Sequence, residues 1–149
     1  MIQNRYFGGQ IDPGQVAVAA LYHDASEILT GDMPTPIKYD NPDIQSAYKQ
    51  VEAVAEQKLL NMLPEDLRPA YDEALTISDP QVRALVKAAD KLSAYLKCVE
   101  EVKAGNNEFK KAKEQTYAAL CQNQIPALRY FMDRFLDGFE LTLDELSEE

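Results

Sequence analysis

Apolar residues recur at steps of three and four along almost every segment of this 149-residue chain, with polar positions between them. This spacing places apolar side chains on one face of a helix, and the alternation that is typical of strands is negligible. Proline and glycine separate the periodic segments and mark where helices begin and end. The pattern predicts an all-α protein, with helices over residues 42–62, 65–76, 80–103, 107–123 and 126–136 and a final helical turn over 141–146.

The first predicted helix carries the only histidine of the chain. Asp12 provides an N-cap and Pro13 suits the first helical position, after which Val16, Ala19, Ala20 and His23 continue on one face. Residues 30–36 follow with one glycine and two prolines, which cannot continue a helix. We therefore expect a stiff loop directly after the histidine-bearing helix.

Composition narrows the class of protein. The length fits one domain, predicted over residues 1–149 with an acidic tail over 138–149, and the net charge of −10 disfavours binding to long nucleic acids. Cys98 and Cys121 lack CxxC spacing, so we expect buried reduced thiols rather than disulfides or a thiolate zinc site. Residues 1–9 do not resemble a signal peptide and no apolar run is long enough to span a membrane, which predicts a cytoplasmic protein.

Three polar residues near the predicted loop are candidates for chemistry. Adjacent His23 and Asp24 offer an imidazole nitrogen and a carboxylate oxygen to one divalent metal. On a continuous helix, Glu27 would lie over the same surface and could orient or deprotonate a water molecule. The alternative is that His23 is a partly buried structural histidine while Asp24 and Glu27 are solvated.

Further along the chain, Asp32, Lys38 and Asp90 extend this candidate site. Asp32 follows a glycine in the stiff loop, and Lys38 is placed to offset phosphate charge nearby. Asp90 borders a predicted core stripe of Val86, Ala89, Ser93 and Leu96, where a carboxylate costs desolvation energy unless it is paired or binds a metal. The alternatives are a capping role for Asp32 and a surface ion pair between Asp90 and Lys87 or Lys91.

Three stretches resemble one family of enzymes. They are LYHDASEILTGDMPTPIKY at residues 21–39, KAADKLSAYLKC at residues 87–98 and AGNNEF at residues 104–109. Together they resemble the HD motif, the substrate loop and later helices of the YfbR-type bacterial 5'-deoxynucleotidases, which are HD-domain phosphohydrolases. The similarity extends from Gly8 to the tail.

This resemblance implies an all-α HD-domain helical bundle that removes phosphate from deoxyribonucleoside 5'-monophosphates. It also implies a divalent cation such as cobalt, manganese or zinc, and a homodimer that binds neither nucleic acid polymers nor membranes. The implied roles are metal binding by His23, Asp24 and Asp90; assistance to the attacking water by Glu27; proton donation to the leaving oxygen by Asp32; and substrate binding by Asp24, Asp32, Met33, Pro34, Thr35, Lys38 and Asp90.

The chain departs from the family pattern in one respect. The family has an upstream helical region with another metal-binding histidine and an Arg-Trp pair, whereas this chain has a single histidine and no tryptophan. We therefore expect the sequence to lack an N-terminal segment, and its bundle to be incomplete. Metal binding should then be weak, loss of activity is one expected consequence, and apolar surface should be exposed.

Two other functions remain open. One is an HD phosphohydrolase that acts on nucleoside triphosphates or cyclic nucleotides, against which the substrate-loop resemblance argues. The other is a non-catalytic helical binding or scaffolding protein, which the missing histidine and tryptophan favour.

Overall fold

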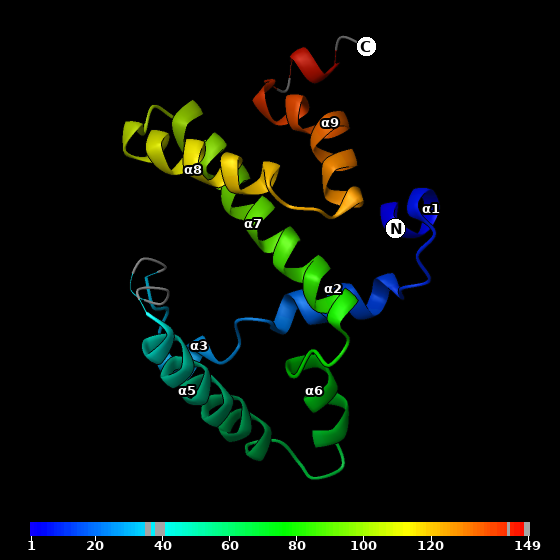
Figure 1. The fold of residues 1–149 in the computed structure, drawn as a ribbon, viewed down its shortest axis with the longest axis vertical. Coiled ribbons are helices and arrows are strands. Elements are labelled where there is room, and N and C mark those ends of the chain that lie inside the picture. Colours follow the sequence, from blue (N-terminus) through cyan, green and yellow to red (C-terminus); the bar gives the residue numbers. More distant parts are fainter. Residues whose placement is uncertain (35–36, 38–40, 143, 148–149) are drawn as a thin grey trace. The chain divides into compact units, whose positions relative to one another are not determined.

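The computed structural model describes residues 1–34, 37, 41–142 and 144–147 (Figure 1). Its regular elements are helical and none of these described ranges contains a strand, which confirms the predicted all-α class. The chain divides into two compact units, residues 17–80 and residues 1–16 together with 81–149. The prediction of one domain over residues 1–149 stays a prediction.

The unit of residues 17–80 is built around α5 (Pro42–Asn61). Asn41 caps this helix, because its Oδ1 atom accepts a hydrogen bond from the Ile44 N–H at 2.8 Å, and Pro42 occupies the first turn. The short helix α3 (Glu27–Thr30) and α6 (Arg68–Leu75) both pack on α5. The buried residues of α5 are Tyr48, Ala55 and Leu60.

The other unit has a core formed by three helices, α7 (Pro80–Lys103), α8 (Lys110–Cys121) and α9 (Pro126–Glu140). The 3-10 turn η1 (Asn107–Phe109) precedes α8, and η2 (Glu145–Ser147) follows α9. The core residues are apolar and come from all three helices: Ala88, Tyr95, Val99, Leu120 and Leu128. Burial of these side chains provides the main stabilisation of this unit.

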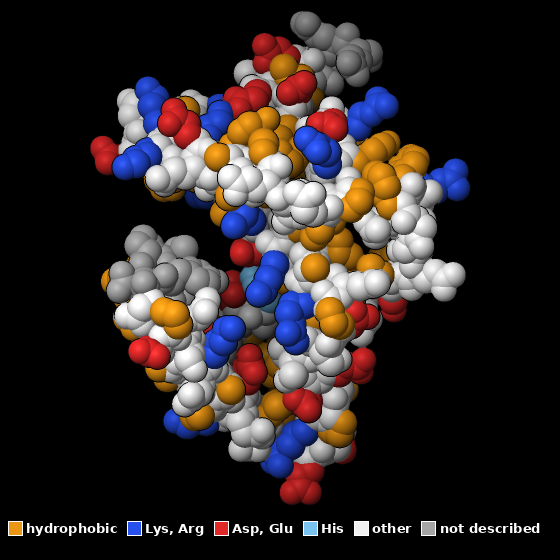
Figure 2. Space-filling view, viewed as in Figure 1, with side chains coloured by type: hydrophobic (Ala, Val, Ile, Leu, Met, Phe, Trp, Pro, Cys, Tyr) orange, Lys and Arg blue, Asp and Glu red, His pale blue; other side chains and the backbone are white. Residues whose placement is uncertain are grey.

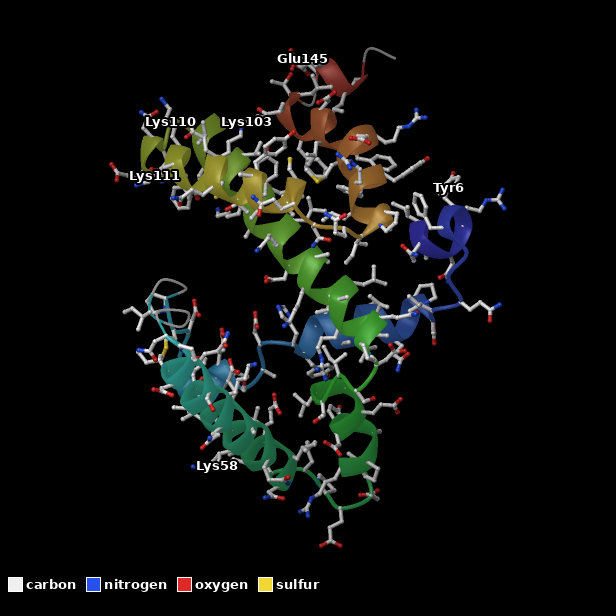
Figure 3. The ribbon with its side chains drawn as sticks, viewed as in Figure 1. Tyr6, Lys58, Lys103, Lys110, Lys111 and Glu145 are labelled. Atoms are coloured by element: carbon white, nitrogen blue, oxygen red, sulfur yellow. The ribbon has the colours of Figure 1, made fainter. Side chains whose placement is uncertain are left out.

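Polar contacts hold the end of α9. The Lys103 Nζ atom donates hydrogen bonds to the carbonyl oxygens of Phe139 at 3.1 Å and Leu141 at 2.9 Å. The Glu145 carboxylate accepts hydrogen bonds from the Thr142 N–H and hydroxyl, which lower the pKa of Glu145. Lys103 and Glu145 are labelled in Figure 3 beside this end of the helix. Lys103 therefore acts as a C-terminal cap supplied by another helix.

One helix at the N-terminus was not predicted. Ile2–Phe7 form α1, which packs on α9, where the Tyr6 ring stacks on the Tyr130 ring with centroids 4.7 Å apart. A helix of this length gives no periodic signal in the sequence and depends on such packing. Gly8 ends it with a φ of 72°, a backbone conformation that favours glycine.

Two further expectations were wrong. The last long helix does not stop at Leu136; α9 continues through Gly138 to Glu140, so the first residues of the expected acidic tail are helical. Cys98 is buried as expected, but Cys121 is exposed. Hydrophobic side chains also reach the surface over α9 (Figure 2), where Phe135 and Phe139 are 48% and 41% exposed.

Among the residues that the structure describes, no helix combines the length and the hydropathy that crossing a membrane requires.

Candidate metal and phosphate site

The chain reaches the His-Asp pair through α2 (Pro13–Tyr22), which begins as predicted. The Asp12 Oδ1 atom accepts a hydrogen bond from the Gly14 N–H at 2.8 Å, and the Asp12 carbonyl accepts one from Val16. The helix ends one residue before His23, however. The prediction that His23 continues the helical face was therefore wrong by one position, within the usual margin for a helix end.

Residues 23–26 form turns between α2 and α3. Their hydrogen bonds join residues three apart, from the Ala25 N–H to the Tyr22 carbonyl at 3.0 Å and from the Glu27 N–H to the Asp24 carbonyl at 2.9 Å. This tighter winding replaces the continuous α-helix on which the expected alignment of His23, Asp24 and Glu27 depended. Glu27 instead begins α3 and is half-buried.

The two ring nitrogens of His23 have different neighbours. Nδ1 lies 2.7 Å from the Ala20 carbonyl oxygen, and Nε2 lies 3.0 Å from the Asp24 Oδ2 atom. A carbonyl oxygen only accepts hydrogen bonds, so Nδ1 carries the proton. In the neutral ring, Nε2 then presents its lone pair beside a carboxylate oxygen.

This arrangement fits a divalent cation. A metal-binding histidine ordinarily donates its other ring N–H to a carbonyl or carboxylate, as His23 does to Ala20. An imidazole nitrogen and a carboxylate oxygen together suit zinc, cobalt or manganese. The Nε2 atom of His23 is itself buried, whereas the Asp24 side chain is 57% exposed, so Asp24 provides the solvent-facing side of the pair.

The loop after α3 begins at Gly31, which has a φ of 72°. The Gly31 N–H closes α3 by donating to the Glu27 carbonyl at 2.9 Å. Asp32 and Pro34 are exposed and Met33 is half-buried, and residues 31–34 are non-helical as predicted. Thr35 and Lys38, the other two expected residues of this loop, lie outside the described residues.

Asp90 lies on α7, in the other unit, and is exposed. The argument that burial forces Asp90 to find a partner was therefore wrong. The predicted stripe is only partly right: Val86 is buried and Leu96 is half-buried, but Ala89 and Ser93 are exposed, whereas Ala88 and Tyr95 are buried. Metal binding by Asp90 stays a prediction.

A family model described as 5'-deoxynucleotidase YfbR-like matches residues 1–139. The chain belongs to this YfbR-like family. Its relatives include the 5'-deoxynucleotidase of Vibrio cholerae serotype O1, which is 49% identical over 149 residues, or 99% of this chain and 77% of the relative. The Shewanella oneidensis 5'-deoxynucleotidase is 50% identical over 151 residues, which are 99% of this chain and 77% of the relative. The Escherichia coli 5'-deoxynucleotidase YfbR is 49% identical over 152 residues, or 99% of this chain and 75% of the relative.

Membership of the YfbR-like family confirms the predicted HD-domain class. The structure adds one residue of interest that the sequence pattern does not indicate. Tyr48 is buried in α5, and its hydroxyl donates a hydrogen bond to the Gly31 carbonyl beside the YfbR-like loop. Helical periodicity identifies Tyr48 as a core residue of α5, but no sequence signal reveals the partner of its hydroxyl.

Proposed function

We propose that this chain is a metal-dependent phosphomonoesterase that hydrolyses deoxyribonucleoside 5'-monophosphates to a deoxynucleoside and phosphate. The observation that carries the proposal is the His23 ring, with Nδ1 bonded to the Ala20 carbonyl and Nε2 3.0 Å from the Asp24 carboxylate. Membership of the YfbR-like family, whose named relatives are 5'-deoxynucleotidases, supports the choice of substrate.

His23 and Asp24 are the proposed metal ligands within the unit of residues 17–80, and Asp90 is a third ligand by family resemblance. When bound, cobalt, manganese or zinc supplies a Lewis acid that stabilises phosphate charge and makes water more acidic. The role of Ala20 is to hold the His23 tautomer, so that Nε2 offers its lone pair to the cation.

The remaining roles concern proton transfer and substrate position. Glu27 orients the attacking water and accepts its proton as the water oxygen bonds to phosphorus. The bond between phosphorus and the 5'-oxygen breaks, and Asp32 donates the proton that the leaving oxygen requires. Met33, Pro34 and Thr35 contact the substrate, together with Asp24 and Asp90, and Lys38 offsets phosphate charge.

Separate Glu27→Ala and Asp32→Ala variants test these roles. Each should lower kcat by about a hundredfold or more, because general acid–base catalysis contributes on that scale. Asp66→Asn, an exposed carboxylate of the same unit, is the control and should keep wild-type turnover. Near-normal turnover in a correctly folded Glu27→Ala or Asp32→Ala protein would reject that residue's assignment.

Substrate class is tested with a panel of nucleotides. Phosphate release from deoxyribonucleoside 5'-monophosphates should exceed release from triphosphates, and cyclic nucleotides should not be opened. A preference for triphosphates or cyclic nucleotides would indicate that the chain is an HD phosphohydrolase of another substrate class.

The proposal includes a cytoplasmic homodimer. Exposed apolar side chains near the candidate site, Leu21 at 81% and Ile28 at 78%, support association with a second copy. Light scattering at several protein concentrations measures the mass, and a monomer at every concentration would contradict this part of the proposal.

A further inference from the structure

The Tyr48 side chain connects α5 to the start of the candidate substrate loop. Its hydroxyl donates a hydrogen bond to the Gly31 carbonyl at 3.0 Å, across 17 positions in sequence. Tyr48 is only 6% exposed, and both residues belong to the unit of residues 17–80. A buried ring with a fixed hydroxyl provides a rigid attachment point.

The Gly31 carbonyl belongs to the peptide group that leads into Asp32. Because a peptide group is planar, fixing the direction of this carbonyl also fixes the plane from which the Asp32 backbone starts. The Thr30 hydroxyl donates to the same oxygen at 2.9 Å, and the Gly31 N–H donates to the Glu27 carbonyl at 2.9 Å. The peptide groups on both sides of Gly31 are thus held by hydrogen bonds.

The Asp32 carboxylate has no comparable attachment of its own. Asp32 is exposed, and within the described ranges no hydrogen bond or ion pair holds its side chain. Gly31 adopts a φ of 72°. Because glycine has no Cβ atom, its backbone can also adopt other φ values at little steric cost. The orientation of the Asp32 side chain therefore depends on the backbone contacts that restrain Gly31.

We propose that Tyr48 is a positioning residue, whose hydroxyl holds the peptide between Gly31 and Asp32 so that the Asp32 carboxylate faces the leaving oxygen. The proposal rests on the proposed function, because it assumes the role of Asp32 in hydrolysis. In this proposal Tyr48 acts through the position of Asp32 and is assigned no contact with substrate or metal. Its contribution is to reduce the number of orientations that Asp32 samples before proton transfer.

The test compares Tyr48→Phe with Tyr71→Phe in the full chain. Tyr48→Phe removes the hydroxyl and keeps the buried ring. Tyr71→Phe removes a hydroxyl from the same unit, where the Tyr71 ring contacts the Tyr22 ring edge-on at 5.9 Å. Circular dichroism should show wild-type helix content in both variants.

Kinetics with cobalt or manganese separate positioning from packing. Tyr48→Phe should lower kcat on the order of tenfold and change KM less than about twofold, because substrate contacts remain while Asp32 is misoriented. Tyr71→Phe should keep wild-type values. Wild-type kcat in Tyr48→Phe, or equal losses in both variants, would overturn the proposal.

Amide hydrogen exchange tests the attachment without turnover. A peptide covering residues 29–33 should exchange faster in Tyr48→Phe than in wild type, and at the wild-type rate in Tyr71→Phe. Unchanged exchange in Tyr48→Phe would overturn the attachment whether or not the enzyme is active. An inactive, metal-bound wild type with faster exchange in Tyr48→Phe would instead refute the proposed function, and with it the positioning role.

Discussion

The Nε2 atom of His23 lies 3.0 Å from the Oδ2 atom of Asp24. Because Nδ1 donates its proton to the Ala20 carbonyl, Nε2 directs its lone pair toward the carboxylate. A divalent cation that binds both atoms would make this pair a metal site. The same geometry thus serves as a structural contact or a binding site, and metal titration distinguishes the two.

Removing either partner should weaken metal binding. His23→Ala or Asp24→Asn should raise the Kd for cobalt or manganese by tenfold or more, about 1.4 kcal/mol at 25 °C, because each removes one ligand. Isothermal titration calorimetry measures the change. Asp66→Asn removes an exposed carboxylate from the same unit, so it controls for net charge and should bind like wild type. Equal affinity in wild type and His23→Ala would exclude His23 as a ligand.

Lys103 should stabilise the end of α9. Lys103→Met removes the donor to the Phe139 and Leu141 carbonyls, so we expect a loss of up to about 1 kcal/mol in the free energy of unfolding. Hydrogen exchange at residues 138–142 should also become faster. Urea denaturation measures the loss, and Lys110→Met, an exposed position at the start of α8, is the control. Matching stabilities for the two variants would argue against the cap.

The ionised Glu56 side chain should destabilise the folded protein when the pH is above the ordinary pKa of a glutamate. Burial, followed by the charges of Glu52 and Asp72, raises the pKa of Glu56 in the folded chain. The folded state therefore holds the proton more tightly, so stability from this group is greatest at low pH and falls as pH rises from its ordinary pKa toward the raised one.

The Glu56→Gln substitution tests this linkage. The variant should unfold at a higher temperature than wild type at pH 7, and the difference should shrink as pH is lowered through that window. Thermal unfolding, followed by circular dichroism at pH 7 and at a pH near the ordinary pKa of a glutamate, provides the measurement. Glu73→Gln, which neutralises an exposed carboxylate of α6, should show little change. A lower unfolding temperature for Glu56→Gln at pH 7 would contradict the account.

The long helices were predictable because each has a strong periodic pattern and clear end signals. Pro42 and Pro80 begin α5 and α7 as expected, and Lys103 ends α7 before Gly105. The helix predicted to stop at Leu136 instead continues through Gly138, because a glycine within a helix costs only about 1 kcal/mol, which packing of α9 offsets. The short α1 escaped notice because tertiary contact with Tyr130, rather than local sequence, supports it.

The candidate site was only partly predictable from sequence. The pairing of His23 with Asp24 followed from their adjacency, but the turn that separates them from α2 depends on hydrogen bonds that no composition rule specifies. The predicted face of α7 was only partly right, because Ala88 and Ala89 are equally apolar in sequence and only packing distinguishes the buried Ala88 from the exposed Ala89. Tyr48 shows the same limit, since its hydroxyl partner lies 17 residues away.

The most direct test of the proposed function is phosphate release from a deoxyribonucleoside 5'-monophosphate by the metal-loaded chain, with cobalt or manganese added. We predict release that stops when EDTA removes the metal and falls by about a hundredfold or more in Glu27→Ala. No release from a folded chain that binds metal, or release unaffected by EDTA, would contradict the account.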